Sequence, residues 1–208
     1  HRGDAGDVRR ALEAVLQALQ LEGAAGRGGS VGMVDGHRPA SRRPGGVTSP
    51  GPIPLSRVTM RVLLTGFSVG GSLVWYLACQ APDQFAAYAP VAGGFWVPQP
   101  SSCAGPVKLL HTHGWSDQTV PLEGRPLRPG LAQGDIFAGL ALWRSVNGCV
   151  GERPDRFDTG GSFWRRTWSE CTPGTTLELA LHQGGHEVPV GWPTLALDWF
   201  ESIVPGPD

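Results

Sequence analysis

The sequence has little charge and no long hydrophobic run. Charged residues make up 17% of its 208 residues, the formal net charge is −1, and Lys108 is the only lysine. This balance provides neither the basic surface that nucleic acids require nor an acidic tail. No apolar run reaches the ~18 residues of a membrane-spanning helix. We therefore expect neither nucleic acid nor a membrane as a partner.

The chain also lacks an initiator methionine and an N-terminal signal peptide. It begins with His1-Arg2-Gly3-Asp4, which is typical of the interior of a longer polypeptide. We expect a fragment or a processed form. The length corresponds to about one domain.

Cysteine is scarce, and the four cysteines contain no Cys-x-x-Cys pair. Without that spacing a zinc site is not expected, and the even number favours two disulfides. Three pairings are possible, of which sequence proximity favours Cys79–Cys103 and Cys149–Cys171. Disulfides would indicate an exported protein, whereas four buried thiols are the alternative.

Glycine and proline are unevenly distributed and divide the chain into three parts. Asp7 can cap an amphipathic helix that runs to about Gln20, so residues 1–22 are expected to hold the N-terminal helix of the domain. Between Gly23 and Thr59, 14 of 37 residues are Gly or Pro, and neither helical nor strand periodicity is present. We expect residues 23–59 to be a disordered insertion and residues 60–208 to form the C-terminal part of the domain.

The C-terminal part is organised around Gly66-Phe67-Ser68-Val69-Gly70. An apolar run from Val62 to Leu64 precedes it, and an apolar segment typical of a helix, Leu73–Cys79, follows it. A serine between glycines at a strand-to-helix turn is the pattern of a nucleophile elbow. The glycines allow close backbone approach, and the helix N-terminus points at the serine. The backbone N–H of Val69 can then stabilise an oxyanion.

Further apolar segments predict alternating strands and helices. The predicted strands are Arg61–Thr65, Phe85–Val91, Val107–Thr112 and Leu177–Leu181. The predicted helices are Val69–Gln80, Ile136–Asn147 with Asp135 as cap, and a last helix from Pro193; Phe95–Ala104 is expected to be a loop and Gly151–Thr175 a disulfide-pinned excursion. Apolar strands without strict alternation indicate a mostly parallel sheet with both faces covered, a doubly wound α/β fold.

Three residues with complementary proton chemistry follow predicted strands. Ser68, Asp117 and His186 each lie just past a carboxyl end, and their order along the chain is that of α/β-hydrolases. A serine hydroxyl is a poor nucleophile unless a histidine takes its proton, and a carboxylate orients that histidine. The pattern predicts a catalytic triad of nucleophile, orienting acid and base.

Other residues compete for these roles. His182 lies at the strand end itself and is the alternative to His186. Glu123 and Asp135 are the alternatives to Asp117, although they lie further from a strand end, and Asp83 follows the elbow helix on the wrong side of the sheet.

His111 and His113 share one face of a predicted strand, as two metal ligands would. No third ligand is apparent, so we expect no metal and no other cofactor. His113 is expected to pack beneath the site or to line it.

At these residues the sequence resembles α/β-hydrolase esterases of the polyhydroxybutyrate depolymerase-like group, which includes feruloyl and acetylxylan esterases of carbohydrate esterase family one. The resemblance lies in Leu63–Gly71, Leu77–Gly94, His113–Pro121 and Gly184–His186. It implies Ser68 as nucleophile, Asp117 as orienting acid and His186 as base, in an exported enzyme that needs no metal. It also supports the pairings Cys79–Cys103 and Cys149–Cys171.

The chain departs from that family pattern near its beginning. Members carry several strands before the first helix, so the resemblance implies a fold that is truncated at its N-terminus. A loop among those strands supplies a second oxyanion donor in the family, and only the Val69 N–H is assigned here.

The sequence therefore predicts a secreted, monomeric serine esterase that acts on hydroxyalkanoate polymers or acylated polysaccharides. Trp96, Trp115 and Trp192 lie in loops near the predicted site and are candidates for stacking on a sugar or an aromatic acyl group. A serine peptidase of the same fold is a lesser alternative. The alternative from another class is a non-catalytic hydrolase remnant that binds polysaccharide.

Overall fold

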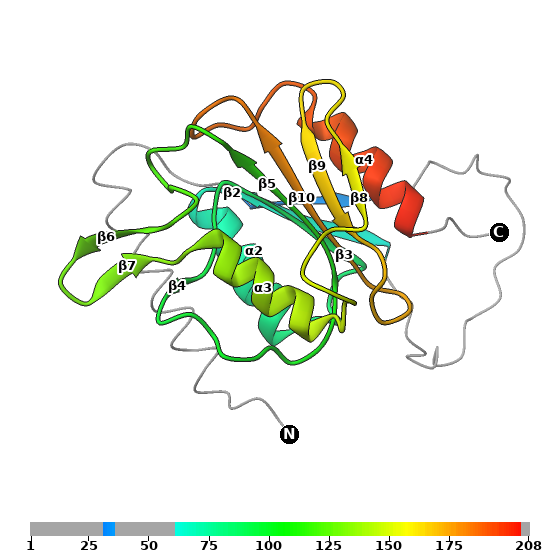
Figure 1. The fold of residues 1–208 in the computed structure, drawn as a ribbon, viewed down its shortest axis with the longest axis horizontal. Coiled ribbons are helices and arrows are strands. Elements are labelled where there is room, and N and C mark those ends of the chain that lie inside the picture. The colour runs from blue at the N-terminus through cyan, green and yellow to red at the C-terminus, as the bar shows by residue number, and fades with distance from the viewer. Residues whose placement is uncertain (1–30, 36–60, 205–208) are drawn as a thin grey trace, which may run out of the picture.

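The computed structural model describes residues 31–35 and 61–204, and within them one mixed sheet forms the centre (Figure 1). Its seven strands lie in the order β1 (Val31–Asp35), β2 (Val62–Phe67), β3 (Ala87–Val91), β5 (Lys108–Gly114), β10 (Thr176–His182), β9 (Trp164–Trp168) and β8 (Arg156–Asp158). β2, β3, β5 and β10 run parallel to one another. β1 pairs antiparallel at one edge, and β9 and β8 do so at the other. The α/β class is as predicted, but the parallel arrangement holds only for the four central strands.

Helices cover both faces of this sheet. α2 (Val69–Gln80) and α3 (Ile136–Val146) pack on one face, and α4 (Trp192–Ile203) packs on the other. Neighbouring residues of a strand point to opposite faces, so Leu64 enters the core under α2 and α3 while Leu63 enters the core under α4. Helix α3 begins as predicted, because the Asp135 carboxylate accepts the N–H of Ala138 at 2.9 Å.

A small second sheet was not predicted. It has the strand order β4 (Trp96–Val97), β7 (Leu131–Gln133) and β6 (Arg125–Arg128). The expectation of a loop from Phe95 to Ala104 is thus wrong at Trp96 and Val97, where pairing with β7 makes a two-residue strand. Val97, Pro98 and residues 126–132 of the β6–β7 hairpin line an open cavity of about 760 Å³, to which none of the predicted triad residues contributes.

The expectation that residues 23–59 contain no regular structure is wrong at Val31–Asp35, which form β1. The register pairs Val31 with Gly66 and Asp35 with Val62. Main-chain pairing with the buried strand β2 therefore gives this short segment its strand conformation despite its lack of alternation. The predicted helix from Asp7 to Gln20 and the rest of 23–59 lie outside the described residues.

Two further strands, β8 and β9, lie in the stretch that was expected to be an excursion, Gly151–Thr175. β9 extends the main sheet by pairing with β10, and this pairing brings Arg165 and Thr167 to the buried carboxylate of Glu178. β8 is exposed along its whole length, and β9 has a single buried residue, Trp168, so neither strand carries the apolar run that identifies buried strands.

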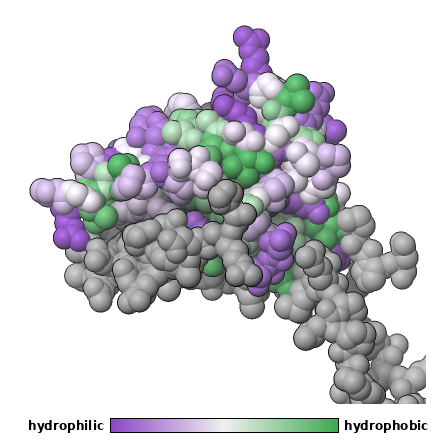
Figure 2. Space-filling model, turned by 90° about the horizontal axis from the view of Figure 1, so that it is seen from below, coloured by the Kyte–Doolittle hydropathy of each residue, from purple (hydrophilic) through white to green (hydrophobic). Residues whose placement is uncertain are grey.

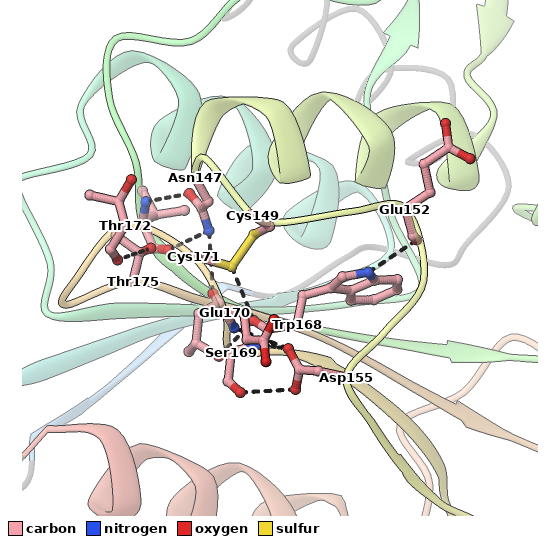
Figure 3. Close-up of a disulfide and its surroundings, with 12 residues drawn as sticks. Asn147, Cys149, Glu152, Asp155, Trp168, Ser169, Glu170, Cys171, Thr172 and Thr175 are labelled. Atoms are coloured by element: carbon pink, nitrogen blue, oxygen red, sulfur yellow. Dashed lines mark hydrogen bonds between the residues drawn. A yellow bond between two sulfur atoms is a disulfide. The ribbon is translucent and has the colours of Figure 1, made fainter.

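The structure contains the disulfides Cys79–Cys103 and Cys149–Cys171, the pairs that sequence proximity favours. Figure 3 shows the second disulfide joining the segment after α3 to the turn between β9 and β10. Beside it, the buried Asn147 side chain accepts the Val107 N–H and donates to the carbonyl oxygens of Val107 and Thr176. Asn147 thus ties the end of α3 to the beginnings of β5 and β10.

The surface of the described part is mixed in polarity. Seen from below the view of Figure 1, a hydrophobic patch lies among hydrophilic residues of the described part (Figure 2). Within residues 31–35 and 61–204, no helix is long and apolar enough to cross a membrane.

Candidate active site

Ser68 stands at the turn between β2 and α2 in a strained backbone conformation. Its φ is 61° and its ψ is −122°, a region that non-glycine residues rarely occupy and that costs about 1–3 kcal/mol. The surrounding main chain holds it there, because the Ser68 N–H donates to the carbonyl of Val91 at 2.9 Å and its carbonyl accepts the Ser72 N–H at 3.0 Å. This is the geometry of the predicted nucleophile elbow.

Glycines make this elbow possible through close backbone approach. A Cβ at Gly66 would overlap the carbonyl of Gly70, and one at Gly71 would lie 2.5 Å from the carbonyl oxygen of Val91. A Cβ at Gly93 would overlap the carbonyl oxygen of Ser68. The turn therefore tolerates no side chain at these positions, and the first N–H groups of α2 remain directed towards Ser68. The Val69 N–H is the first of them.

Two loops at the carboxyl ends of β5 and β10 lie against each other. The N–H of Trp115 donates to the carbonyl of His182 at 2.7 Å, and the N–H of Ser116 donates to that of Gly184 at 3.1 Å. A Cβ at Gly114 would overlap the carbonyl of Gly185, so only glycine permits this approach. The main chain thereby places the Asp117 loop next to the His186 loop.

Ser68, His186 and Asp117 form one continuous set of hydrogen bonds. His186 Nδ1 lies 2.8 Å from Asp117 Oδ2, and His186 Nε2 lies 2.8 Å from Ser68 Oγ. Because a carboxylate only accepts, the ring proton resides on Nδ1, and Nε2 is free to accept the Ser68 proton. The side chain of Asp117 is fully buried, and that of His186 is 14% exposed. The arrangement has the geometry of a nucleophile, a base and an orienting carboxylate.

Asp117 is held in its ionised form. Burial alone would favour the neutral acid, but hydrogen bonds from His113, His186 and the Val120 N–H together hold the pKa of Asp117 well below its usual range. Asp117 Oδ1 accepts the N–H groups of Thr119 and Val120, each at 2.8 Å. A carboxylate held at both oxygens can orient the imidazole and stabilise its charged form.

Phe67 supports the imidazole from the side. Its ring centroid lies 4.8 Å from that of His186, with the planes tilted by 38°. No role for this residue is predicted from the sequence. Its position between Gly66 and Ser68 in the elbow was the only available signal, because contact with a loop 119 residues away is not visible in a local pattern.

The alternative residues lie elsewhere. His182 Nδ1 accepts the Gly184 N–H at 3.1 Å, and the ring lies against Phe163 on the α4 side of the sheet. Burial lowers the pKa of His182, although Glu187 acts in the opposite direction. Asp135 caps α3, while Glu123 and Asp83 are exposed. None of these residues takes part in the hydrogen bonds at Ser68.

His111 and His113 are buried beneath Asp117. His111 Nε2 and His113 Nδ1 are 2.9 Å apart, and the indole N–H of Trp75 donates to His111 Nδ1 at 3.2 Å. Burial, with His113 adding to its effect, keeps the pKa of His111 well below its usual value. Within the described residues, no group of three or more His, Cys, Asp or Glu side chains could hold a metal ion.

The three candidate tryptophans occupy different environments. Trp115 is 57% exposed and lies two residues before Asp117. Trp96 is buried against Val69, the residue after the serine. Trp192 packs on the core under α4, where its indole N–H donates to Thr112 at 3.1 Å. Of the three, Trp115 is the most exposed.

Trp164 is an aromatic residue at this edge that was not predicted from the sequence. It pairs with Leu181 at the carboxyl end of β10, is 37% exposed, and lies edge-to-face with Trp115 at a centroid distance of 6.4 Å. Trp164 reaches this edge because β9 pairs with β10, and β9 is not predicted from the sequence.

Comparison with known proteins points to esterases. No family model matches the chain. It is 31% identical over 135 residues to feruloyl esterase C of Emericella nidulans, covering 61% of this chain and 43% of that protein. It is 33% identical over 132 residues to feruloyl esterase D of Neurospora crassa, covering 62% and 40%. It is 28% identical over 137 residues to a bifunctional acetylxylan esterase/xylanase of Neocallimastix patriciarum, covering 62% and 18%. These similarities support an esterase family.

The matches are partial on both sides. The matched part of the chain spans 43% of feruloyl esterase C of Emericella nidulans and 40% of feruloyl esterase D of Neurospora crassa, which is less than half of either protein. More than half of each of these relatives therefore lies outside the aligned region.

Proposed function

We propose that this chain is a serine esterase that cleaves carboxylic esters through an acyl-enzyme. The observation that carries the proposal is the continuous Ser68–His186–Asp117 hydrogen-bond chain at a strained strand-to-helix turn. The similarity to several named esterases supports the same chemistry. The roles are Ser68 as nucleophile, His186 as general base and acid, and Asp117 as the residue that orients and stabilises the imidazole.

The reaction follows from the positions of the protons. As Ser68 Oγ attacks the ester carbonyl carbon, its proton passes to His186 Nε2, 2.8 Å away. The carbonyl oxygen becomes negative and is stabilised by the Val69 N–H at the positive end of α2. Collapse of this intermediate breaks the bond to the alcohol oxygen, which takes the proton from His186. A water molecule, deprotonated by the same nitrogen, then releases the acid and restores Ser68.

The substrates considered are acylated polysaccharides and hydroxyalkanoate polymers. Of these we propose polysaccharides that carry aromatic acyl esters. The proposal rests on the names of the feruloyl esterase relatives and on the exposed pair Trp115 and Trp164 beside the triad. Aromatic side chains that expose their faces can stack on an aromatic acyl group or a sugar ring.

We further propose that the protein is exported. Two disulfides persist only in an oxidising compartment, and both join residues that are brought together by the fold.

The test is ester hydrolysis by the purified, oxidised chain. Methyl ferulate, p-nitrophenyl acetate and a hydroxybutyrate oligomer are offered separately to the wild type and to Ser68→Ala. We expect hydrolysis of the first two by the wild type and a loss of at least ~10³-fold in kcat for Ser68→Ala. A folded wild type that hydrolyses none of the esters would contradict the proposal, and equal rates for both proteins would remove Ser68 from the mechanism.

A further inference from the structure

A buried line of four side chains runs from helix α2 to the carboxylate of Asp117. Trp75 Nε1 lies 3.2 Å from His111 Nδ1, and His111 Nε2 lies 2.9 Å from His113 Nδ1. His113 Nε2 then lies 2.7 Å from the carbonyl oxygen of Val120 and 3.4 Å from Asp117 Oδ2. Trp75, His111 and His113 are each 0% exposed. The reaction proposed above uses none of the three.

The two ends of this line determine where its protons are. An indole nitrogen can only donate, so His111 Nδ1 must be an acceptor and His111 carries its proton on Nε2. A carbonyl oxygen and a carboxylate can only accept, so His113 must carry a proton on Nε2. With these assignments, His111 Nε2–H donates to His113 Nδ1, and every nitrogen in the line has a partner.

Any other placement of these protons would point two donors or two acceptors at each other. With a proton on both nitrogens, His111 would direct an N–H at the indole N–H of Trp75. Without a proton on Nε2, His113 would direct a lone pair at the oxygens of Val120 and Asp117. A proton on His113 Nδ1 would face the N–H of His111 Nε2, so each ring carries its single proton on Nε2 and the two share one tautomer. Besides Asp117, His182 interacts electrostatically with His113, and His182 itself lies near Glu187.

We propose that His113 is a positioning residue of the triad, which holds the turn that carries Asp117 by donating to the Val120 carbonyl. The Val120 N–H on the same peptide turn donates to Asp117 Oδ1 at 2.8 Å. His113 Nε2 lies 2.7 Å from the Val120 carbonyl oxygen but 3.4 Å from Asp117 Oδ2, so His113 positions Asp117 mainly through the Val120 turn. Trp75 and His111 keep His113 in the donating tautomer. The inference rests on the proposed function, because it assigns a role in the same triad.

The first test replaces His113 and measures kcat and KM separately. His113→Leu removes the donor, whereas His113→Gln keeps an amide N–H that can reach Val120. We expect kcat for p-nitrophenyl acetate to fall by ~10- to 100-fold in His113→Leu with KM changed by less than about twofold, because a loosely held acid misplaces the base. His113→Gln should recover most of that loss. An active wild type with an equally active His113→Leu would overturn the inference and leave the proposed function intact.

The second test uses a matched pair of tryptophan variants. Trp75 and Trp143 are both fully buried in the same core, but the indole N–H of Trp143 has no partner among the described residues. Each Trp→Phe exchange removes a similar volume, and only Trp75→Phe removes a bond to the histidine line. We expect Trp75→Phe to lower kcat several-fold and Trp143→Phe to leave it within about twofold. Equal losses in the two variants would show a packing effect and contradict the inference.

The third test needs no variant and remains decisive if His113→Leu does not fold. Nitrogen-15 NMR of the imidazole rings in the wild type reports which ring nitrogen carries the proton. We expect His111 and His113 both as neutral Nε2–H tautomers. A proton on Nδ1 of either ring would overturn the inference. A folded wild type that neither hydrolyses esters nor reacts at Ser68 would remove the proposed function and, with it, the role of His113.

Discussion

At the scale of single residues, the candidate site combines a strained serine with a histidine of fixed tautomer. The φ of 61° at Ser68 costs about 1–3 kcal/mol, and close glycine packing around the turn maintains it. The carboxylate of Asp117, fully buried and held by two main-chain N–H groups, determines which nitrogen of His186 faces the serine. The chemistry of Ser68 thus depends on loops that follow three different strands.

A prediction concerns the pair of exposed tryptophans. Trp115→Ala and Trp164→Ala should each raise KM for methyl ferulate by about 2- to 10-fold, the equivalent of one aromatic contact. KM for p-nitrophenyl acetate, whose acyl group has no aromatic ring, is the internal control and should change little. Trp192→Ala is the matched variant, because its indole is bound to Thr112 in the core; it should lower stability without changing the ratio of the two KM values. Equal effects on both esters would exclude acyl stacking.

A second prediction concerns His111 and pH. Because its folded pKa is depressed, the unfolded chain binds a proton below pH ~6.5 that the folded chain does not bind. The free energy of unfolding should therefore decrease as pH falls from about 6.5, by up to ~1.4 kcal/mol per pH unit from this group.

Urea unfolding of the wild type and His111→Gln between pH 7.5 and 5 measures this slope. Gln offers a donor and an acceptor but does not titrate, so its slope should be shallower. A residual slope is expected from His182, whose pKa is also lowered by burial. Parallel slopes for the two proteins would contradict the assignment of a neutral His111.

At the scale of elements, strands that end at one edge bring the site together. β2 and β5 lead into the Ser68 and Asp117 turns, and β10 leads into the His186 loop. Asn147 fixes the other ends of β5 and β10, where it bonds to the main chain of Val107 and Thr176.

The third prediction therefore compares the two polar residues that cap α3, Asp135 at its start and Asn147 at its end. Asn147→Ala leaves buried N–H and C=O groups without partners and should lower the free energy of unfolding by ~3 kcal/mol or more. Asp135→Ala removes one N-cap bond and should cost only about 1 kcal/mol. Chemical denaturation of both variants at pH 7 measures the difference. An Asn147→Ala variant no less stable than Asp135→Ala would contradict this role of Asn147.

Elements with an apolar signal were predictable from the sequence, and polar ones were not. Helix α2 has the predicted bounds, Val69–Gln80, because the elbow defines its start and Pro82 follows its end. β6 and β8 are exposed along their whole length, so no alternation of apolar residues marks them. β1 takes its conformation from pairing with β2, which a local pattern does not contain.

The same distinction applies within the site. Ser68, Asp117 and His186 were predicted because strand ends converge at one edge of a parallel sheet. The hydrogen bonds between Trp75, His111 and His113 were not predictable, because they depend on how α2 lies over β5. Their spacing alone predicts that the two histidines lie on one face of a strand, as two metal ligands would. In the structure the two rings are hydrogen-bonded to each other, and His111 also accepts the indole N–H of Trp75.

At the scale of the whole molecule, two disulfides join the ends of the helices that cover one face of the sheet to other segments of the chain. Cys149–Cys171 joins the segment after α3 to the connection between β9 and β10, across 22 residues of sequence. Cys79–Cys103 joins the end of α2 to the loop after β4, across 24 residues.

The fourth prediction follows from the closed loops. The Cys149→Ser, Cys171→Ser double variant should have a free energy of unfolding about 2–4 kcal/mol below that of the oxidised wild type, because the unfolded chain regains conformational freedom. Urea denaturation measures the difference. Mass spectrometry of non-reduced peptides provides the control by identifying both pairs in the wild type. Four alkylatable thiols in the folded wild type would contradict the disulfides and the proposed export.

We propose above all that Ser68 is a nucleophile activated by His186. The most direct test of this activation is labelling of the folded chain by a serine-directed fluorophosphonate, followed by peptide mapping. We predict a single label at Ser68, a rate at least ~10³-fold lower in His186→Ala, and a rate close to that of the wild type in His182→Ala. No label on Ser68 in the folded wild type, or a loss of labelling only in His182→Ala, would contradict the activation of Ser68 by His186.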